Sequence, residues 1–375
     1  MKIFCMISSL QLGGAERQLL GLASTLQKAG HEVCVLTYRK NDFYKDTLAA
    51  QGLASVVFEK KTNVVSWALS LGRYLKEQGC ELLIAFLPGA CLKALLVHRL
   101  NPCFRLVLSE RNFSRRLGVL ERFRLWAARI EADKVICNNY AQEELIRRQI
   151  PALSAKMGTI PNFVDVDYFS PAADGSVSTD GRVPVDGAPV SDGACRQILV
   201  TARVCRRKNT LGLIRAAALL KEKGLRFRID WWGVTRENAY YNKCMALIGR
   251  LDLRDEFHLH PATVEVRELY RKADIFCLPS FYEGTSNSIA EALSCGKPVA
   301  CSRVSDNPRY VKEGENGFLF DPSDVSSMAE ALERALKADC DTLARMGRVS
   351  RETAFAQLHP DHFARAYQEL IDSLR

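Results

Sequence analysis

The chain has 375 residues, of which 47% are hydrophobic and 25% charged, and its formal net charge is +9. This length and composition exclude a disordered chain or a disulfide-stapled peptide, and they suffice for two domains with separate cores. No apolar run reaches the length of about 18 residues that a transmembrane helix needs. The 13 cysteines include no Cys-x-x-Cys pair, which predicts free thiols in a reducing cytoplasm and no zinc site.

Short apolar runs alternate with amphipathic stretches along the first part of the chain. The apolar start predicts a core strand and not a signal peptide. The predicted strands are residues 3–7, 32–37, 82–86, 106–108 and 134–138, and the predicted helices are residues 15–28 and 64–78. Strands and helices that alternate at this spacing predict a parallel sheet.

Residues 171–193 differ in composition from everything around them. They are rich in Gly, Pro, Ser and Asp and poor in large apolar residues, which predicts a mobile linker. The alternation then resumes, with strands at 198–201, 227–232, 257–260, 274–278 and 299–302, and helices at 210–221, 240–250 and 362–374. The sequence therefore predicts domains at 1–168 and 196–355, a linker at 169–195 and a final segment at 356–375.

Two glutamates, Glu283 and Glu291, lie eight positions apart after the strand at 274–278. The first falls in a glycine-containing loop and the second in an apolar helix that Ser286 or Asn287 can cap. The N–H groups and the dipole at that helix N-terminus favour a phosphate. Two carboxylates at this spacing could bracket a ligand with phosphates and hydroxyls, or they could be solvated residues of a surface helix.

Five short motifs follow one another in the order of a known family. They are Gly13-Gly14-Ala15-Glu16, Pro161-Asn162-Phe163-Val164-Asp165, Ala202-Arg203-Val204 followed by Lys208-Asn209, the pair Glu283 and Glu291, and Glu313-Gly314-Glu315-Asn316-Gly317. Together they resemble the retaining glycosyltransferases of family 4 over nearly the whole chain, with Phe163 where the family has glycine. The resemblance implies the α/β GT-B fold: two Rossmann-like, doubly wound parallel-sheet domains, an interdomain cleft, and a last helix that returns to the first domain.

The resemblance gives the second domain the role of binding a nucleotide-sugar. Such enzymes use no bound metal, so cationic side chains must oppose the charge that develops on the diphosphate. Arg203 and Lys208 match the family positions, and we expect them to act in catalysis. A solvated basic loop is the alternative, and we expect Arg206 and Arg207 to be surface charges.

The resemblance assigns the ribose and the sugar of the nucleotide-sugar to the two glutamates. Glu291 is expected to accept hydrogen bonds from the two ribose hydroxyls, because a carboxylate offers two acceptor oxygens. Glu283 is expected near the reacting carbon of the sugar, as a catalytic group but not as a covalent nucleophile. The backbone from Gly284 through Thr285, Ser286 and Asn287 is expected to reach the diphosphate.

The first domain is expected to bind the acceptor. Gly13 and Gly14 let the backbone approach a ligand closely, and a simple tight turn is the alternative. Glu16 is a weak acceptor-contact candidate that could merely complement the helix dipole. Many family members carry a histidine near Ser109–Asn112, and this chain has none there. Its further acceptor candidates are therefore Glu110, Arg111 and Asn112, with Glu110 as a possible base.

The segment Arg111–Arg129 intermixes arginines with Phe113, Leu120, Phe123 and Trp126. A basic amphipathic helix of this kind can lie on an anionic membrane surface, and the net charge of +9 agrees with that. The alternative is a packed helix with an arginine-rich outer face. Nucleic acid is not an expected partner, because no nucleic-acid-binding motif accompanies the charge.

The sequence thus predicts a cytoplasmic retaining glycosyltransferase, peripheral at the inner face of the membrane. It would transfer a sugar from a nucleotide donor, UDP by family habit, to a glycan or lipid-linked glycan in bacterial surface-polysaccharide or lipopolysaccharide assembly. No cofactor or metal is expected. The alternatives are another GT-B enzyme, such as a sugar-nucleotide epimerase or a phosphorylase, and a non-catalytic relative that binds a nucleotide-sugar or a partner protein.

Overall fold

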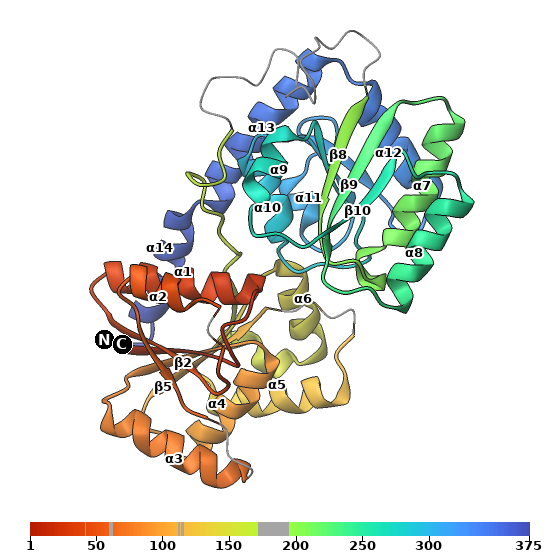
Figure 1. Cartoon of the computed structure of the whole chain (residues 1–375). Helices are drawn as coiled ribbons and strands as arrows, with labels where there is room; N and C mark the ends of the chain where they lie inside the picture. Colours follow the sequence, from red (N-terminus) through yellow and green to blue (C-terminus); the bar gives the residue numbers. More distant parts are fainter. Residues whose placement is uncertain (42, 60–62, 112, 114–115, 172–194) are drawn as a thin grey trace. The chain divides into compact units, whose positions relative to one another are not determined.

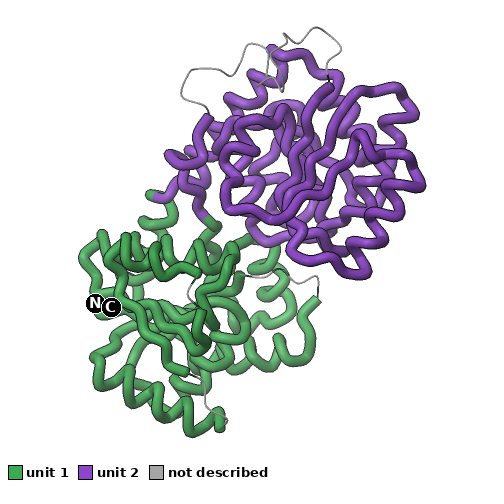
Figure 2. Tube along the Cα trace, viewed as in Figure 1, with its two compact units in different colours: residues 1–162, 361–375 green, residues 163–360 purple. Residues whose placement is uncertain are grey.

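The structure is a computed structural model, and it describes residues 1–41, 43–59, 63–111, 113, 116–171 and 195–375. These residues form two compact units (Figure 2). Unit 1 comprises Met1–Asn162 and Asp361–Arg375, and unit 2 comprises Phe163–Pro360. Residues 172–194 of the predicted linker, and the acceptor candidate Asn112, lie outside the described residues.

Unit 1 is built on a seven-stranded parallel sheet in the order β3-β2-β1-β4-β5-β6-β7 (Figure 1). Its strands are β1 Lys2–Ile7, β2 Glu32–Thr37, β3 Ala54–Val57, β4 Leu82–Phe86, β5 Arg105–Glu110, β6 Lys134–Cys137 and β7 Met157–Thr159. Its helices are α1 Gly14–Lys28, α2 Lys45–Ala50, α3 Val64–Glu77, α4 Pro88–Leu100, α5 Val119–Glu131, α6 Tyr140–Gln149 and α14 Pro360–Asp372, with a 3-10 turn at Pro151–Lys156.

Helices cover both faces of this sheet, which is why its central strands are continuous apolar runs. Along β1, Phe4 and Met6 enter a core that α3, α4 and α5 close with residues such as Trp67 and Leu125. The alternate residues of β1 point to the opposite face, where α1 buries Leu19. The strand order reverses between β1 and β4, and ligands of such sheets bind beyond the carboxyl ends at that point.

Unit 2 has a six-stranded parallel sheet in the order β10-β9-β8-β11-β12-β13. Its strands are β8 Arg196–Thr201, β9 Phe227–Val234, β10 Phe257–Pro261, β11 Ile275–Leu278, β12 Val299–Ser302 and β13 Gly317–Phe320. Its helices are α7 Thr210–Glu222, α8 Ala239–Arg250, α9 Val266–Lys272, α10 Asn287–Ser294, α11 Asn307–Tyr310, α12 Val325–Lys337 and α13 Cys340–Leu358, with a 3-10 turn, η2, at Arg206–Lys208. Separate apolar cores lie on its two faces, and the strand order reverses between β8 and β11.

The two units divide between Asn162 and Phe163, whereas the sequence places the division after residue 168. The reason is that Val164 and Phe169 are buried in a core of unit 2. Arg351 of α13 holds the same segment by donating to the Phe169 carbonyl at 2.8 Å. At the other end of the chain, residues 361–375 belong to unit 1.

Candidate active site

The loop between β11 and α10 carries the two glutamates and has the predicted local structure. Ser286 is the N-cap of α10, and its hydroxyl accepts a hydrogen bond from the Ile289 N–H at 3.4 Å. Gly296 ends the helix with φ of 68°, a conformation that favours glycine. Glu283 in the loop and Glu291 in the helix are both buried. The diphosphate remains a prediction for the N-terminus of this helix, which begins at Asn287.

The structure brings Lys208 and Glu283 together although they lie 75 residues apart in the chain. Lys208 ends the turn η2 after β8, and its Nζ donates to Glu283 Oε1 at 2.5 Å. Arg207 Nη1 lies 3.5 Å from the other carboxylate oxygen of Glu283. The prediction that Arg207 is only a surface charge is therefore wrong, because the turn η2 directs two consecutive cations at one carboxylate.

The pKa of the Glu283 carboxyl reflects two opposing effects. Burial raises the pKa of this carboxyl, and the nearby charges of Lys208 and Arg207 lower it. The charges prevail, so the pKa of Glu283 lies below its ordinary value of 4.5. The side chain is thus an ionised carboxylate at neutral pH inside a largely buried site.

Arg203 lies at the carboxyl end of β8 and is exposed, and it forms no ion pair with any described residue. The backbone around it is fixed by Gly233, which has φ of 148°. A Cβ at Gly233 would lie 2.0 Å from the Ala202 carbonyl oxygen, so only glycine allows this approach. The Val204 N–H donates to the Gly233 carbonyl at 3.3 Å, which holds the turn that presents Arg203.

Glu291 is held by a residue that the sequence motifs do not include. The Tyr270 hydroxyl donates to Glu291 Oε2 at 2.8 Å and lies 2.6 Å from Thr201 Oγ1 at the end of β8. Tyr270 is fully buried, and this burial, followed by the charge of Glu291, raises the pKa of its hydroxyl well above the ordinary value. A tyrosine in α9 gives no sequence signal of this contact, because it depends on the order of strands in the sheet.

Gly13 and Glu16 occupy one site at the N-terminus of α1. Gly13 is extended, with φ of −172°, so any residue could adopt its backbone conformation. A Cβ there would nevertheless lie 2.2 Å from Glu16 Oε2, because the Glu16 carboxylate folds back over Gly13. Burial raises the pKa of that carboxyl. Gly14 is the first residue of the helix, and the Glu16 carboxylate lies in its first turn, where it complements the helix dipole.

The other acceptor candidates in unit 1 are engaged inside the protein. Glu110 is buried and forms a bidentate ion pair with Arg124, with 2.9 Å between Arg124 Nη2 and Glu110 Oε2. Arg111 is also buried, and it donates to Ser109 Oγ, Asn162 Oδ1 and Tyr367 Oη at 2.8, 2.7 and 2.7 Å. These contacts count against Glu110 as a base and against Arg111 as an acceptor contact.

Two family models match the chain: "Glycosyltransferase Family 4" over residues 12–168 and "Glycosyl transferases group 1" over residues 189–353. The chain belongs to the family 4 glycosyltransferases. A D-inositol 3-phosphate glycosyltransferase from Pseudarthrobacter chlorophenolicus is 28% identical over 223 residues, which are 58% of this chain and 51% of the relative. The UDP-Gal:alpha-D-GlcNAc-diphosphoundecaprenol alpha-1,3-galactosyltransferase of Escherichia coli is 26% identical over 206 residues, which are 54% of this chain and 50% of that relative. The chain thus spans about half the length of these curated relatives.

The solved structure of Anabaena HepE in complex with UDP has a TM-score of 0.83 to this family 4 chain at 18% identity, with 100% of each chain covered. At that identity the likeness concerns the fold alone. It confirms the predicted fold class, the GT-B type with two Rossmann-like parallel-sheet domains.

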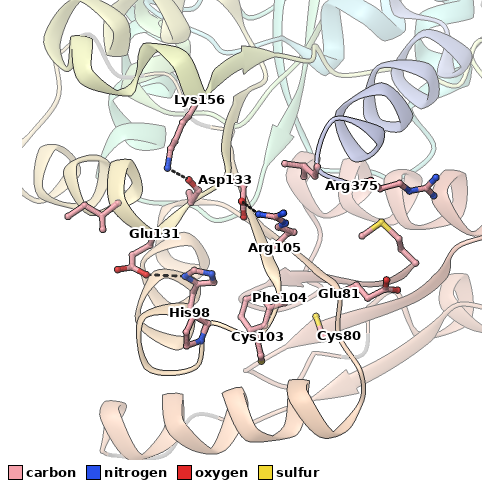
Figure 3. A pocket seen from close by; sticks show the side chains of 15 residues that line it. Cys80, Glu81, His98, Cys103, Phe104, Arg105, Glu131, Asp133, Lys156 and Arg375 are labelled. Atoms are coloured by element: carbon pink, nitrogen blue, oxygen red, sulfur yellow. Dashed lines mark hydrogen bonds and ion pairs between the residues drawn. The ribbon is translucent and has the colours of Figure 1, made fainter.

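Unit 1 has a cavity of about 820 Å³ (Figure 3). It opens at the amino ends of β4, β5 and β6, opposite the carboxyl ends where such sheets bind ligands. Two pairs of its side chains lie in contact, His98 with Glu131 at 3.0 Å and Arg105 with Asp133 at 3.1 Å (Figure 3). None of the predicted site residues lines it.

Among the described residues, no cluster of three or more His, Cys, Asp or Glu side chains is placed to hold a metal ion. All 13 cysteines are free thiols. A search of the same described residues finds no helix with the length and hydropathy to cross a membrane.

Proposed function

We propose that this family 4 member is a retaining glycosyltransferase that uses a nucleotide-sugar donor, with UDP as its nucleotide. The observation that carries the proposal is the buried contact of Lys208 and Arg207 with Glu283, beside the N-terminus of α10. A leaving diphosphate needs cations and N–H donors that are fixed before the reaction begins. Unit 2 collects both at the carboxyl ends of β8 and β11.

Each charged residue has a defined task in this proposal. Arg203 supplies a planar guanidinium and Lys208 a point charge to the diphosphate, so that no metal is required. Glu291 accepts the ribose hydroxyls. Glu283, kept ionised by its two cations, stabilises positive charge on the sugar ring, and its bond from Lys208 makes it a poor nucleophile. This agrees with a reaction on one face of the donor without a covalent intermediate.

The relatives support the choice of nucleotide and the biological setting. The Escherichia coli relative carries UDP-Gal and a diphosphoundecaprenol-linked sugar in its name, and the structure of HepE contains UDP. We infer that the acceptor here is a glycan or a lipid-linked glycan of bacterial surface-polysaccharide or lipopolysaccharide assembly. The protein would reach it from the cytoplasm, at the face of an anionic membrane.

Calorimetric titration with UDP, GDP, ADP and CMP in the presence of EDTA tests the donor site. We expect UDP alone to bind, and Arg203→Ala to remove most of that binding. Arg345→Ala is the matched control, because this exposed arginine of α13 lies outside the proposed site. Binding that needs a divalent metal, or that both variants weaken equally, contradicts the assignment.

Turnover of the donor tests the reaction itself. Glu283→Gln should lower UDP release with a sugar donor by at least about a hundredfold, the scale on which one preorganised electrostatic contact acts. The affinity for UDP should change much less, because Glu283 is assigned to the sugar. Tight UDP binding by the wild type without turnover of any UDP-sugar would instead indicate a non-catalytic relative.

A further inference from the structure

Helix α5 of unit 1 presents a row of large apolar side chains to solvent. The exposed fractions of five of them lie between 51% and 84%: Val119 84%, Leu120 83%, Phe123 60%, Trp126 51% and Ile130 53%. A helix at the surface of a soluble domain normally turns such residues toward the core. Five of them on one helix form a contiguous patch of the kind that marks an interaction surface.

The opposite face of α5 packs against the core of unit 1. Leu125 and Ala128 are fully buried in the core of unit 1, and Arg124 is buried in its ion pair with Glu110. The exposed row is therefore a second apolar face that this fold does not need. Two arginines of the predicted basic segment, Arg111 and Arg124, are engaged inside unit 1 and therefore do not belong to its outer face.

The remaining arginines flank the apolar row. At about 100° per residue, Val119, Phe123, Trp126 and Ile130 fall within about 60° of arc, with Arg122 and Arg129 next to them on one side. Arg122, Arg129 and Arg116, which precedes the helix, are all exposed. The Arg129 guanidinium lies 5.8 Å from the ring centroid of Trp126, so cation and aromatic ring share one edge of the row.

We propose that α5 is a membrane-docking helix that lies in the interface of an anionic bilayer. Its apolar row would enter the boundary between head groups and acyl chains, and Arg116, Arg122 and Arg129 would contact the lipid phosphates. Tryptophan and arginine side chains combine an apolar body with a polar end, which suits this depth. The inference goes beyond the proposed function and rests on it only in that a lipid-linked acceptor would be found at such a surface.

The charge of the protein favours an anionic bilayer, and not a second copy of the chain, as the partner that covers the apolar row of α5. A two-fold dimer through α5 would place the same patch on both sides, so that the arginines of both copies would enter one interface. The chain as a whole carries a net charge of +9, which disfavours self-association and favours an anionic surface.

Vesicle co-sedimentation tests the proposal on the full chain without a donor or an acceptor. We expect binding to vesicles of equal parts phosphatidylcholine and phosphatidylglycerol, weak binding to phosphatidylcholine alone, and loss of binding as salt rises. The double variant Leu120→Glu/Phe123→Glu should abolish binding. Arg122→Gln/Arg129→Gln should weaken it by about fivefold for each arginine. The matched controls are Val65→Glu/Leu69→Glu on α3 and Arg345→Gln/Arg348→Gln on α13, which change exposed residues of the same kinds.

Tryptophan fluorescence identifies the residue that enters the lipid. Of the four tryptophans, Trp67 and Trp231 are fully buried and Trp126 is half exposed. Brominated lipids should therefore quench wild-type emission, and Trp126→Phe should remove most of this quenching while Trp232→Phe does not. Equal binding by the α5 variants and their controls would overturn the proposal, as would a concentration-dependent dimer that the α5 variants abolish. A retained UDP interaction in each variant shows that unit 2 is intact and separates this outcome from a failure of the proposed function.

Discussion

Tyr270→Phe removes one buried hydroxyl from unit 2 and leaves the ring that packs the core. That hydroxyl donates to Glu291 at 2.8 Å and lies 2.6 Å from Thr201 Oγ1. Tyr270 is fully buried and Glu291 is 5% exposed, so water has little room to replace the lost bond. We therefore expect the Glu291 carboxylate to lose both a stabilising contact and a defined orientation.

The magnitude follows from the chemistry of the bond. A hydrogen bond to a buried charged group contributes about 1.5–3 kcal/mol to stability. For a unit of this size each kcal/mol shifts Tm by about 2–4 °C, so the variant should melt roughly 3–12 °C lower. If about half of the free energy is lost from the bound state through a loosened carboxylate, the Kd for UDP rises about fivefold.

Calorimetric titration with UDP and with 2′-deoxy-UDP measures how Tyr270→Phe changes the recognition of the ribose hydroxyls. If Tyr270 acts through Glu291, Tyr270→Phe should reduce the discrimination between the two nucleotides, because that discrimination comes from the ribose hydroxyls. In a Glu291→Gln background the same substitution should have almost no further effect on affinity. Tyr310→Phe, in the same core of unit 2, is the control for the loss of a buried hydroxyl. The reasoning is refuted if Tyr270→Phe weakens UDP binding equally in both backgrounds, or if discrimination between the nucleotides is unchanged.

Three other substitutions test single features of the structure. Gly233→Ala should lower the free energy of unfolding by about 1–3 kcal/mol through its backbone conformation alone, and by more through the clash of the new Cβ with the Ala202 carbonyl. The control in urea unfolding is Gly224→Ala, which has φ of 72° and open space around it and therefore shows the conformational cost by itself. Because the folded pKa of Glu283 is lowered, its pairing stabilises the fold above about pH 4.5 and is lost as pH falls through the folded pKa. Lys208→Met should move that loss to higher pH in thermal melts, and an unchanged acid profile would contradict the pairing. Glu110→Gln should destabilise unit 1 by about 3–5 kcal/mol, because it leaves a buried arginine charge uncompensated, and a near-neutral effect in chemical unfolding would contradict this.

Local sequence pattern predicts most strands well, but it misses β3, β7 and β13, and it predicts several helices poorly. The strands Leu82–Phe86 and Val299–Ser302 have the predicted bounds, because an apolar run bounded by turn residues has few other ways to be buried. Helix α4 gives no such signal, since it begins directly after β4 with Pro88 and Gly89, which are typical of a loop. Helix α13 places Gly347 and Ser350 on its buried face, so its apolar periodicity is weak.

The site shows the same division between local and long-range information. The capping of α10 by Ser286 follows from adjacent residues and was predictable. The family motifs assign Lys208 and Glu283 to one donor site, but the ion pair between the two side chains was not predicted, and no local rule gives it. Arg207 and Tyr270 were missed because their contacts depend on which strands are neighbours, and strand order is not encoded in any one segment.

Strand order is also what makes a single site out of separate motifs. β11 pairs directly with β8, as Ile275 does with Ile198, although these strands lie far apart in the chain. The loops that follow the two strands must then emerge side by side at one edge of the sheet, one with Lys208 and the other with Glu283. The same neighbourhood lets the hydroxyl of Tyr270 reach both the end of β8 and the helix that follows β11. A substitution that disturbed the pairing of β8 with β11 would therefore separate the cations from the carboxylates even if every site residue were retained.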